Sequence, residues 1–258
     1  MTLIHPRAVI APEAKLGSDV SVGAFSVIGP GVAVGRGTTI GSHVIIDGIA
    51  EIGERCQISS HVVLGAPPQI LEDRNEMTRL VIGHQTVVRE FASVHRGSLR
   101  GRGTTMLGQR NYIMAYAHVG HDCVLGDDVV VSSQAGLAGH VEVEERAVIG
   151  GKAGIHQFVR IGKYAMVGAC SAVSQDIPPF MMAHGNRARC YGLNTVGLRR
   201  YGVSREAIVK LKQAYRAIFL SKLNTSQALE RLATEVDSCP EVEHLIHFIK
   251  ISSRGIAR

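Results

Sequence analysis

The chain has 258 residues, of which 45% are hydrophobic, 5% are aromatic and none is tryptophan, and its formal net charge is +6. No uninterrupted apolar run reaches the roughly 18 residues that a membrane-spanning helix needs, and the N-terminus lacks a signal-peptide pattern. The five cysteines form no CxxC pair and no disulfide framework, so we expect reduced thiols and a cytoplasmic protein.

From the N-terminus onward, an aliphatic residue recurs at every sixth position. The first run extends from Ile4 to Leu64, a short second run from Ile82 to Val94, and a third from Leu107 to Val173. A glycine follows many of these positions, as expected where the chain turns a corner after each short strand. Neither a helix nor an ordinary strand has this period. It is the hexapeptide signature of a parallel β-helix with three faces and about 18 residues in each coil.

Two segments interrupt the hexads. Residues 65–81 carry no hexad, yet Leu64 and Ile82 are 18 positions apart, so we expect the register to be kept. Residues 95–106 shift the register by seven residues. Insertions in a solenoid protrude as loops, commonly on the binding face, although tolerated surface decoration is the alternative interpretation.

Histidines that could perform acid–base chemistry gather in the second half of the solenoid. They are His95, His118, His121, His140 and His156, and Asp122 follows His121 directly. Val119 should point inward, which places His118 and His121 against the outer wall. Asp122 and His140 are 18 residues apart and should stack on neighbouring coils. A carboxylate beside a histidine can hold one tautomer and keep the ring basic enough to take a proton from a hydroxyl.

Helical patterns replace the hexads after residue 179. The three expected helices begin at Ser204, at Thr225 or Ser226, and at Pro240, and the second includes Val236. We therefore expect a β-helix over residues 1–183 and a helical domain over residues 184–258. The helices should cap one end of the solenoid, which would otherwise expose a hydrophobic coil.

Basic residues concentrate at this junction and in the first expected helix. This basic patch comprises Arg187, Arg189, Arg199, Arg200, Arg205, Lys210, Lys212, Arg216 and Lys222. It should attract an acidic partner. No nucleic-acid module and no aromatic interleaving accompany it, so a small acidic carrier protein or a phosphorylated ligand fits better than nucleic acid. Solvation of an exposed helix is the alternative.

Several motifs resemble those of the UDP-N-acetylglucosamine O-acyltransferases of lipid A biosynthesis. They are the HxxHD segment His118–Asp122, the loop His95–Gly97, Gly150–Phe158, Gln175–Pro179, Gly185–Asn186, Gly192–Asn194 and Arg254–Arg258. The resemblance covers essentially the whole chain and implies a left-handed β-helix that forms a homotrimer, with active sites between subunits. It also implies transfer of a 3-hydroxyacyl group from acyl carrier protein to the 3-hydroxyl of a UDP-sugar, without a metal, a cofactor or an acyl-enzyme.

The resemblance also assigns roles to individual residues. It implies that His121 is the general base with Asp122 as its neighbour, and that a backbone N–H near Gly139 stabilises the oxyanion. The implied substrate-binding positions are Gln69, His95, His118, Gly139, His140, His156, Gln157, Asn194 and Arg200, and Ala169 matches the position that sets acyl-chain length.

The chain departs from the family pattern at four positions: Ile70, Glu72, Val196 and Tyr201. Ile70 and Val196 replace acidic residues, Glu72 replaces a cationic one, and Tyr201 replaces the second of two paired arginines. These positions contact the sugar nucleotide in the family. The acceptor sugar, 3-O or 3-N acylation, and the acyl-chain length therefore stay open.

Other functions are compatible with a hexapeptide solenoid. A γ-type carbonic anhydrase needs three zinc-bound histidines, and metal analysis would separate it. An acetyl-CoA-dependent acetyltransferase would work without a carrier protein, and a non-catalytic scaffold would tolerate loss of the histidines. The N-acyltransferase of the same pathway normally carries an extra N-terminal domain, for which the first hexad at Ile4 leaves no room.

Overall fold

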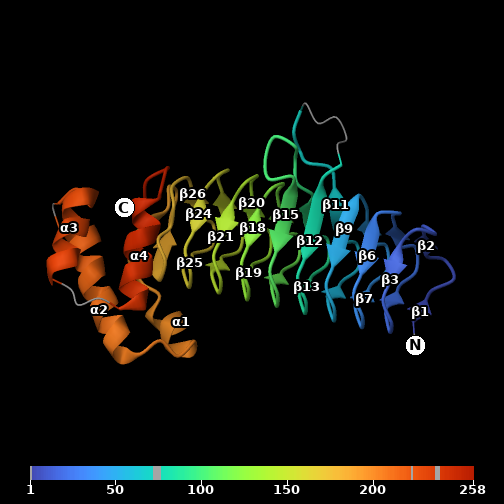
Figure 1. Cartoon of the computed structure of the whole chain (residues 1–258), viewed down its shortest axis with the longest axis horizontal. Coiled ribbons are helices and arrows are strands. Elements are labelled where there is room, and N and C mark those ends of the chain that lie inside the picture. Colours follow the sequence, from blue (N-terminus) through green and yellow to red (C-terminus); the bar gives the residue numbers. More distant parts are fainter. Residues whose placement is uncertain (1, 72–76, 222, 236–238) are drawn as a thin grey trace.

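The computed structural model of the chain describes residues 2–71, 77–221, 223–235 and 239–258. It is an elongated parallel solenoid with helices at its C-terminal end (Figure 1). Most strands are only two residues long, because the chain turns a corner after each of them, and they stack into three sheets.

The three sheets run along the length of the solenoid. The first sheet contains β1 (Leu3–Ile4), β4 (Ser21–Val22), β7 (Thr39–Ile40), β10 (Gln57–Ile58), β13 (Val87–Val88), β16 (Tyr112–Ile113), β19 (Val130–Val131), β22 (Val148–Ile149), β25 (Met166–Val167), β27 (Met181–His184) and β28 (Arg189–Leu193). The second contains β2 (Val9–Ile10), β5 (Val27–Ile28), β8 (Ile45–Ile46), β11 (Val63–Ala66), β14 (Ser93–His95), β17 (His118–Val119), β20 (Gly136–Leu137), β23 (Gly154–Ile155) and β26 (Ala172–Val173). The third contains β3 (Lys15–Leu16), β6 (Val32–Val34), β9 (Ile49–Ile52), β12 (Arg79–Ile82), β15 (Thr104–Leu107), β18 (Val124–Leu125), β21 (Glu142–Val143) and β24 (Arg160–Ile161).

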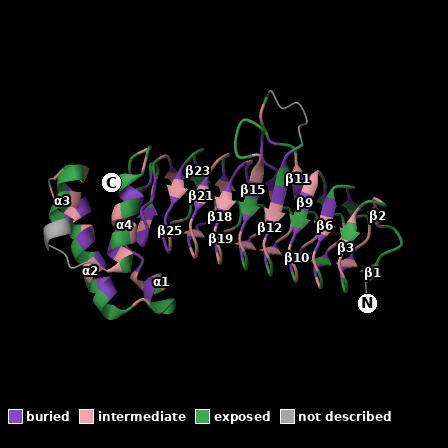
Figure 2. Cartoon of the chain, in the orientation of Figure 1, coloured by how far each residue is buried: buried purple, intermediate pink, exposed green. Residues whose placement is uncertain are grey.

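Stacked hexads form the core. Val131 pairs with Ile149 of the next coil and Leu137 pairs with Ile155, and all four side chains are buried. The aliphatic residue of each hexad therefore points inward, where coils spaced by about 4.8 Å pack it against its equivalents. Figure 2 shows buried residues along the length of the solenoid.

The first insertion does not keep the 18-residue register, contrary to the sequence prediction. Ile82 pairs with Ile52, which is 30 positions away, so the insertion adds 12 residues. The spacing misleads because Leu64 lies in the second sheet and Ile82 in the third, one corner later. The second insertion adds seven residues as predicted, since Ile82 pairs with Leu107, 25 positions away.

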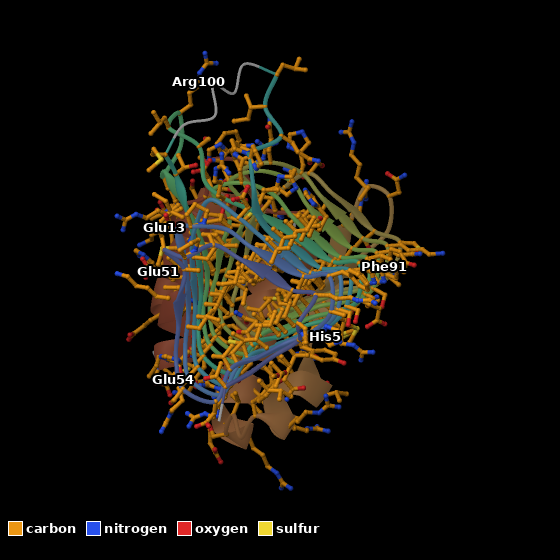
Figure 3. All side chains as sticks on the ribbon, turned by 90° about the vertical axis from the view of Figure 1, so that its right-hand side faces the viewer. His5, Glu13, Glu51, Glu54, Phe91 and Arg100 are labelled. Carbon is orange, nitrogen blue, oxygen red and sulfur yellow. The ribbon has the colours of Figure 1, made fainter. Side chains whose placement is uncertain are left out.

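Both insertions protrude from the corner between the second and third sheets (Figure 1). They contact each other there, because the backbone N–H of Arg96 donates to the carbonyl of Ala66 at 3.0 Å. In the end-on view of Figure 3, Arg100 marks this corner, Phe91 marks the corner between the first and second sheets, and Glu54 marks the third corner. The insertions thus form a wall along one edge of the second sheet.

The predicted helices are confirmed as α2 (Arg205–Tyr215), α3 (Thr225–Glu235) and α4 (Pro240–Lys250). The Ser204 hydroxyl caps α2 by accepting a hydrogen bond from the Ala207 N–H at 3.1 Å. A π-helical turn, η1 (Arg216–Leu220), continues α2. The short α1 (Thr195–Arg200) was not predicted, nor was the antiparallel β27–β28 hairpin that extends the first sheet. Val236 lies outside the described residues.

The helices cover only the C-terminal end of the solenoid (Figure 1). Phe248 of α4 is buried beneath the guanidinium of Arg160 in β24, whereas Leu3 and Val9 of the first coil are exposed. Within the part of the chain that the structure describes, none of the helices is long and apolar enough to cross a membrane.

Candidate active site

A cleft of about 1200 Å³ runs along the outer face of the second sheet and the corner that follows it. The predicted site residues that line it are Gln69, His95, His118, His121, Gly139, His156 and Gln157. The solenoid brings them together because residues from successive coils stack in columns. Gln69 and His95 come from the two insertions, which bound the cleft at one end.

His121 and Asp122 form a dyad in this cleft. The Nδ1 atom of His121 lies 2.8 Å from the Oδ2 atom of Asp122, and the His121 side chain is 14% exposed whereas that of Asp122 is fully buried. An ionised carboxylate can only accept hydrogen bonds, so Nδ1 of His121 carries the proton. The Nε2 atom of a neutral His121 is therefore left as a proton acceptor.

The second insertion encloses the Asp122 carboxylate. The Ser98 hydroxyl donates to Oδ2 at 2.6 Å, the Ser98 N–H lies 3.1 Å from both oxygens, and the Arg102 N–H donates to Oδ1 at 2.8 Å. Burial tends to raise the pKa of Asp122, but the hydrogen bonds from Ser98 and His121 outweigh it and hold that pKa below its usual value. Asp122 is therefore ionised at neutral pH.

Ser98 is a residue that the sequence analysis missed. It lies 24 positions from Asp122 in the chain. The available signals were its place in the second insertion and directly after the motif His95–Gly97. Gly101 also reflects this packing, because a Cβ atom there would lie 2.4 Å from the Asp122 carboxyl carbon.

Gly139 lies one coil beyond His121 and leaves room for the His121 ring. A Cβ atom at this position would lie 2.5 Å from both Cε1 and Nε2 of His121, so any larger residue would displace the imidazole. The backbone N–H of Gly139 donates to no described residue. This N–H therefore remains available to a ligand beside the Nε2 atom of His121.

Two further histidines are held beside the dyad in fixed orientations. Nδ1 of His95 lies 2.6 Å from the carbonyl oxygen of Pro67, and Nδ1 of His118 lies 2.8 Å from the hydroxyl of Ser93. The two rings meet edge to face at 5.1 Å. Burial lowers the pKa of both histidines, so both rings are neutral at pH 7.

His140 supports the dyad from the next coil without lining the cleft. Its ring stacks on Phe158 at 4.4 Å and meets His121 edge to face at 5.0 Å, and its Nε2 atom lies 3.9 Å from Oδ2 of Asp122. The predicted stacking of His140 over Asp122 is thus observed. Burial lowers the pKa of His140, and the charge of Asp122 offsets this only in part.

Besides Asp122 and His140, three predicted site residues do not line this cleft. The Asn194 side chain is buried and caps α1, since its Oδ1 atom accepts from the Gly197 N–H at 3.0 Å and its Nδ2 atom donates to the Tyr164 carbonyl at 2.9 Å. Arg200 is exposed at the end of α1, and Ala169 is exposed at the corner between the first and second sheets. Within one chain, none of them reaches the His121 dyad.

The positions that depart from the family pattern are equally dispersed. Ile70 is half-buried in the first insertion, whereas Val196 and Tyr201 are exposed on α1 and at its end. The ring of Tyr201 lies under the guanidinium of Arg146 at 5.2 Å. Glu72 lies outside the described residues.

The residues around the dyad also include a possible metal-binding cluster and a cysteine. His121, Asp122 and His140 could together offer ligand atoms within 4.8 Å of one another to a metal ion. However, the carboxylate oxygens of Asp122 already accept hydrogen bonds from Ser98 and Arg102, and this set differs from the three histidines of a γ-type carbonic anhydrase. Burial raises the pKa of the Cys123 thiol to about 12, so Cys123 is a core residue and not a nucleophile.

Comparisons with known proteins bear on the whole chain. A family model described as UDP-N-acetylglucosamine O-acyltransferase, domain 2, matches residues 176–257, and one for bacterial transferase hexapeptide repeats matches residues 13–48 and 104–139. The acyl-[acyl-carrier-protein]–UDP-N-acetylglucosamine O-acyltransferases of Thermodesulfovibrio yellowstonii and Alkalilimnicola ehrlichii are 46% and 50% identical, each over 100% of both chains. LpxA, a UDP-N-acetylglucosamine acyltransferase from Bacteroides fragilis, matches with a TM-score of 0.97 at 36% identity, covering 99% of this chain and 100% of that one.

These similarities extend from the first coil to the C-terminal helices, and they agree with the motif resemblance and with the observed fold. The chain belongs to the acyl-[acyl-carrier-protein]–UDP-N-acetylglucosamine O-acyltransferase family.

Proposed function

We propose that the protein transfers a 3-hydroxyacyl group from acyl carrier protein to the 3-hydroxyl of UDP-N-acetylglucosamine, the first step of lipid A biosynthesis. The observation that carries this proposal is the His121–Asp122 dyad, whose Nε2 atom faces the Gly139 backbone at the floor of the cleft. The names of the relatives supply the two substrates. The dyad supplies the base that their reaction requires.

His121 acts as the general base in this mechanism. Its Nε2 atom takes the proton of the sugar hydroxyl as the oxygen attacks the carbonyl carbon of the thioester. The Gly139 N–H stabilises the resulting oxyanion. When the tetrahedral intermediate collapses, the carbon–sulfur bond breaks and the thiolate takes the proton from the His121 imidazolium. The products are the ester and the free thiol of the carrier.

Asp122 orients His121 and stabilises its imidazolium form. Because the Asp122 carboxylate is ionised and buried, it favours the Nδ1–H tautomer in the ground state and the doubly protonated ring during transfer. His95, His118, Gln69 and Gln157 line the same cleft and would position the sugar and the thioester. His156 lies nearer the C-terminal end of the cleft.

The active unit in this proposal is a homotrimer of left-handed solenoids. The support is that Arg200 and Ala169 are exposed but lie outside the cleft of their own chain, so in this proposal they meet substrate in the cleft of a neighbouring subunit. The division into a solenoid over residues 1–183 and a helical domain over residues 184–258 is also a proposal, and its boundary falls within β27. A cytoplasmic location stays a prediction.

The acceptor is tested directly by product analysis. The protein is incubated with a panel of 3-hydroxyacyl carrier proteins and of UDP-sugars that includes 3-amino analogues, and products are identified by mass spectrometry. We expect an ester of UDP-N-acetylglucosamine at the 3-position. An amide formed only with the 3-amino sugar would show that the acceptor has changed, and it would link that change to the substitutions at Ile70 and Val196. Transfer from acetyl-CoA alone would refute the proposed donor.

The role of His121 is tested by substitution. His121→Ala should lower kcat by ~10²–10⁴ because it removes the base, while the protein stays folded. Asp122→Asn should cost less, since it keeps the His121 base and weakens only its orientation and the stabilisation of its imidazolium form. His247→Ala serves as the matched control, because His247 is an exposed histidine on α4 outside the cleft. Activity of His121→Ala within a factor of a few of the control would refute the mechanism.

A further inference from the structure

The last residues of the chain are docked against the final coil of the solenoid. The Asp176 N–H donates to the Gly255 carbonyl at 3.0 Å, and the Ala257 N–H donates to the Asp176 carbonyl at 2.9 Å. The Ser252 hydroxyl donates to Oδ2 of the fully buried Asp176 at 2.7 Å. Ile256 and Ala257 are buried as well. These contacts on both sides hold the intervening residue, Arg254, in one place.

Docking carries Arg254 into the cleft that contains the His121 dyad. Its Nε atom donates to the Ser174 carbonyl at 3.3 Å, and its Nη2 atom lies 3.3 Å from Nδ1 of His156. These contacts leave the N–H groups of Nη1 for a ligand. Arg187, from the connection between β27 and β28, lines the same end of the cleft.

Among the residues that the structure describes, no carboxylate pairs with the positive charges at this end of the cleft. The residues that line the cleft include Arg187 and Arg254 but no aspartate or glutamate, and neither arginine forms an ion pair with a described residue. Guanidinium groups stay charged at every accessible pH and bind phosphate oxygens through paired N–H donors. Two such groups on one wall favour an anionic ligand group.

We infer that Arg254 and Arg187 form a phosphate subsite at the C-terminal end of the cleft. The inference rests on the proposed function for the identity of the ligand, because both substrates carry phosphate. One source is the phosphodiester of the carrier-linked pantetheine arm, and the other is the diphosphate of the sugar nucleotide. Arg254 contacts Ser174, which lies three coils beyond the turn that contains His121. Neighbouring coils are about 4.8 Å apart. The subsite would therefore hold a group remote from the reacting carbonyl.

Steady-state kinetics of Arg254→Gln and Arg187→Gln test the subsite. The donor arm compares a 3-hydroxyacyl-phosphopantetheine with the same thioester of pantetheine, which lacks the phosphate. The acceptor arm varies UDP-N-acetylglucosamine. Arg55→Gln is the control, since Arg55 is exposed on the N-terminal half of the solenoid.

We expect the KM of one substrate to rise about 10- to 100-fold in Arg254→Gln, as for loss of a charge-assisted hydrogen bond, with kcat nearly unchanged. A rise for the phosphorylated donor alone, with the preference over the pantetheine thioester lost, assigns the subsite to the donor. A rise for UDP-N-acetylglucosamine alone assigns it to the acceptor. Values within twofold of Arg55→Gln for both substrates overturn the inference.

Binding measurements test the subsite independently of the proposed function. Phosphopantetheine and UDP are titrated by calorimetry into the parent, Arg254→Gln and Arg254→Lys, the last of which keeps the charge if the glutamine variant fails to fold. Weaker binding of either ligand to Arg254→Gln supports the subsite even if the parent transfers no acyl group. Equal binding of both ligands to the parent and to each variant overturns it.

Discussion

At the scale of single residues, the insertion before β15 fixes the state of the His121–Asp122 dyad. The Asp122 carboxylate is completely buried, which by itself would favour its protonated form. Hydrogen bonds from Ser98 and His121 reverse that preference and hold the pKa of Asp122 below its usual value. The ionised carboxylate then holds the proton of His121 on Nδ1, so Ser98, which does not line the cleft, helps to decide which nitrogen of His121 can accept a proton.

Removing the Ser98 hydroxyl should therefore impair catalysis through Asp122. We expect Ser98→Ala to lower kcat about 10- to 100-fold, because a hydrogen bond to a buried charge is worth about 1.5–3 kcal/mol. The pKa of Asp122 should rise, so the acid limb of the pH–rate profile should move to higher pH. Ser253→Ala, which changes an exposed serine, is the control. An unchanged profile would show that the Ser98 N–H and Arg102 suffice.

The neutral histidines should make stability depend on pH. Burial holds the pKa values of His95, His118 and His140 below the ordinary 6.5. As the pH falls below about 6.5, the unfolded chain takes up protons first, so the free energy of unfolding decreases until the folded-state pKa values are reached. We expect a lower thermal midpoint at pH 5.5 than at pH 7.5, and a smaller difference in His118→Gln. Equal midpoints for the parent would contradict this.

At the scale of elements, the corners of the solenoid determine which residues can meet. Asp122, His140 and Phe158 occupy the same position in successive turns, each with a positive φ near 60°, and they stack in one column. Ala169 and Cys170 occupy a different corner, where the Cys170 N–H donates to the Gly151 carbonyl at 2.9 Å. Within one chain, a ligand that touches both corners must span the face of the second sheet.

Ala169 should set the acyl-chain length under the trimer proposal. Each buried methylene contributes about 0.8 kcal/mol, so a small change in depth shifts the preference severalfold per carbon. We expect the parent to prefer an intermediate 3-hydroxyacyl chain, Ala169→Gly a longer one and Ala169→Met a shorter one, as measured by competition among carrier-bound donors. Unchanged product lengths in both variants would place the end of the pocket elsewhere, for instance at Met166.

At the scale of the whole molecule, charge is uneven along the long axis. The net charge is +6, and the basic patch lies on the β27–β28 hairpin and on the helices α1, α2 and η1. Arg205 and Lys212 are exposed there, while Lys222 lies outside the described residues. The phosphate subsite and the basic patch share Arg187, so an acidic carrier protein bound to the patch would lie near the end of the cleft.

Charge reversal in the patch should weaken the use of carrier protein. Arg200→Ala, Arg205→Glu and Lys212→Glu should each raise the apparent KM for acyl carrier protein, and added salt should do the same for the parent, because electrostatic attraction is screened. The KM for an acyl-phosphopantetheine without the carrier should stay unchanged in Arg205→Glu and Lys212→Glu. Lys15→Glu, on the first coils, is the control. If the apparent affinity for the carrier did not depend on salt, the basic patch would be only a solvated surface and not a binding site for the carrier.

The sequence alone was sufficient for the periodic part of this protein. The hexads predicted the inward residues, the coil spacing from Leu107 to Val173, and the stacking of His140 over Asp122, because each depends on a regular local repeat. The helix starts could be predicted for the same reason, because Ser204 caps α2 and Pro240 begins α4, and each affects only the first turn of its own helix. The dyad residues are adjacent in the chain, and so they were visible too.

Only the tertiary structure decided the contacts between residues that are far apart in the chain. The enclosure of Asp122 by Ser98, the capping of α1 by Asn194 and the docking that brings Arg254 beside His156 have no local pattern. The first insertion shows the same limit, because its 18-residue spacing predicted a full coil between Leu64 and Ile82, whereas Ile82 lies only one corner later. Side chains from distant segments meet only after the solenoid has stacked its coils, so packing, and not periodicity, selects them.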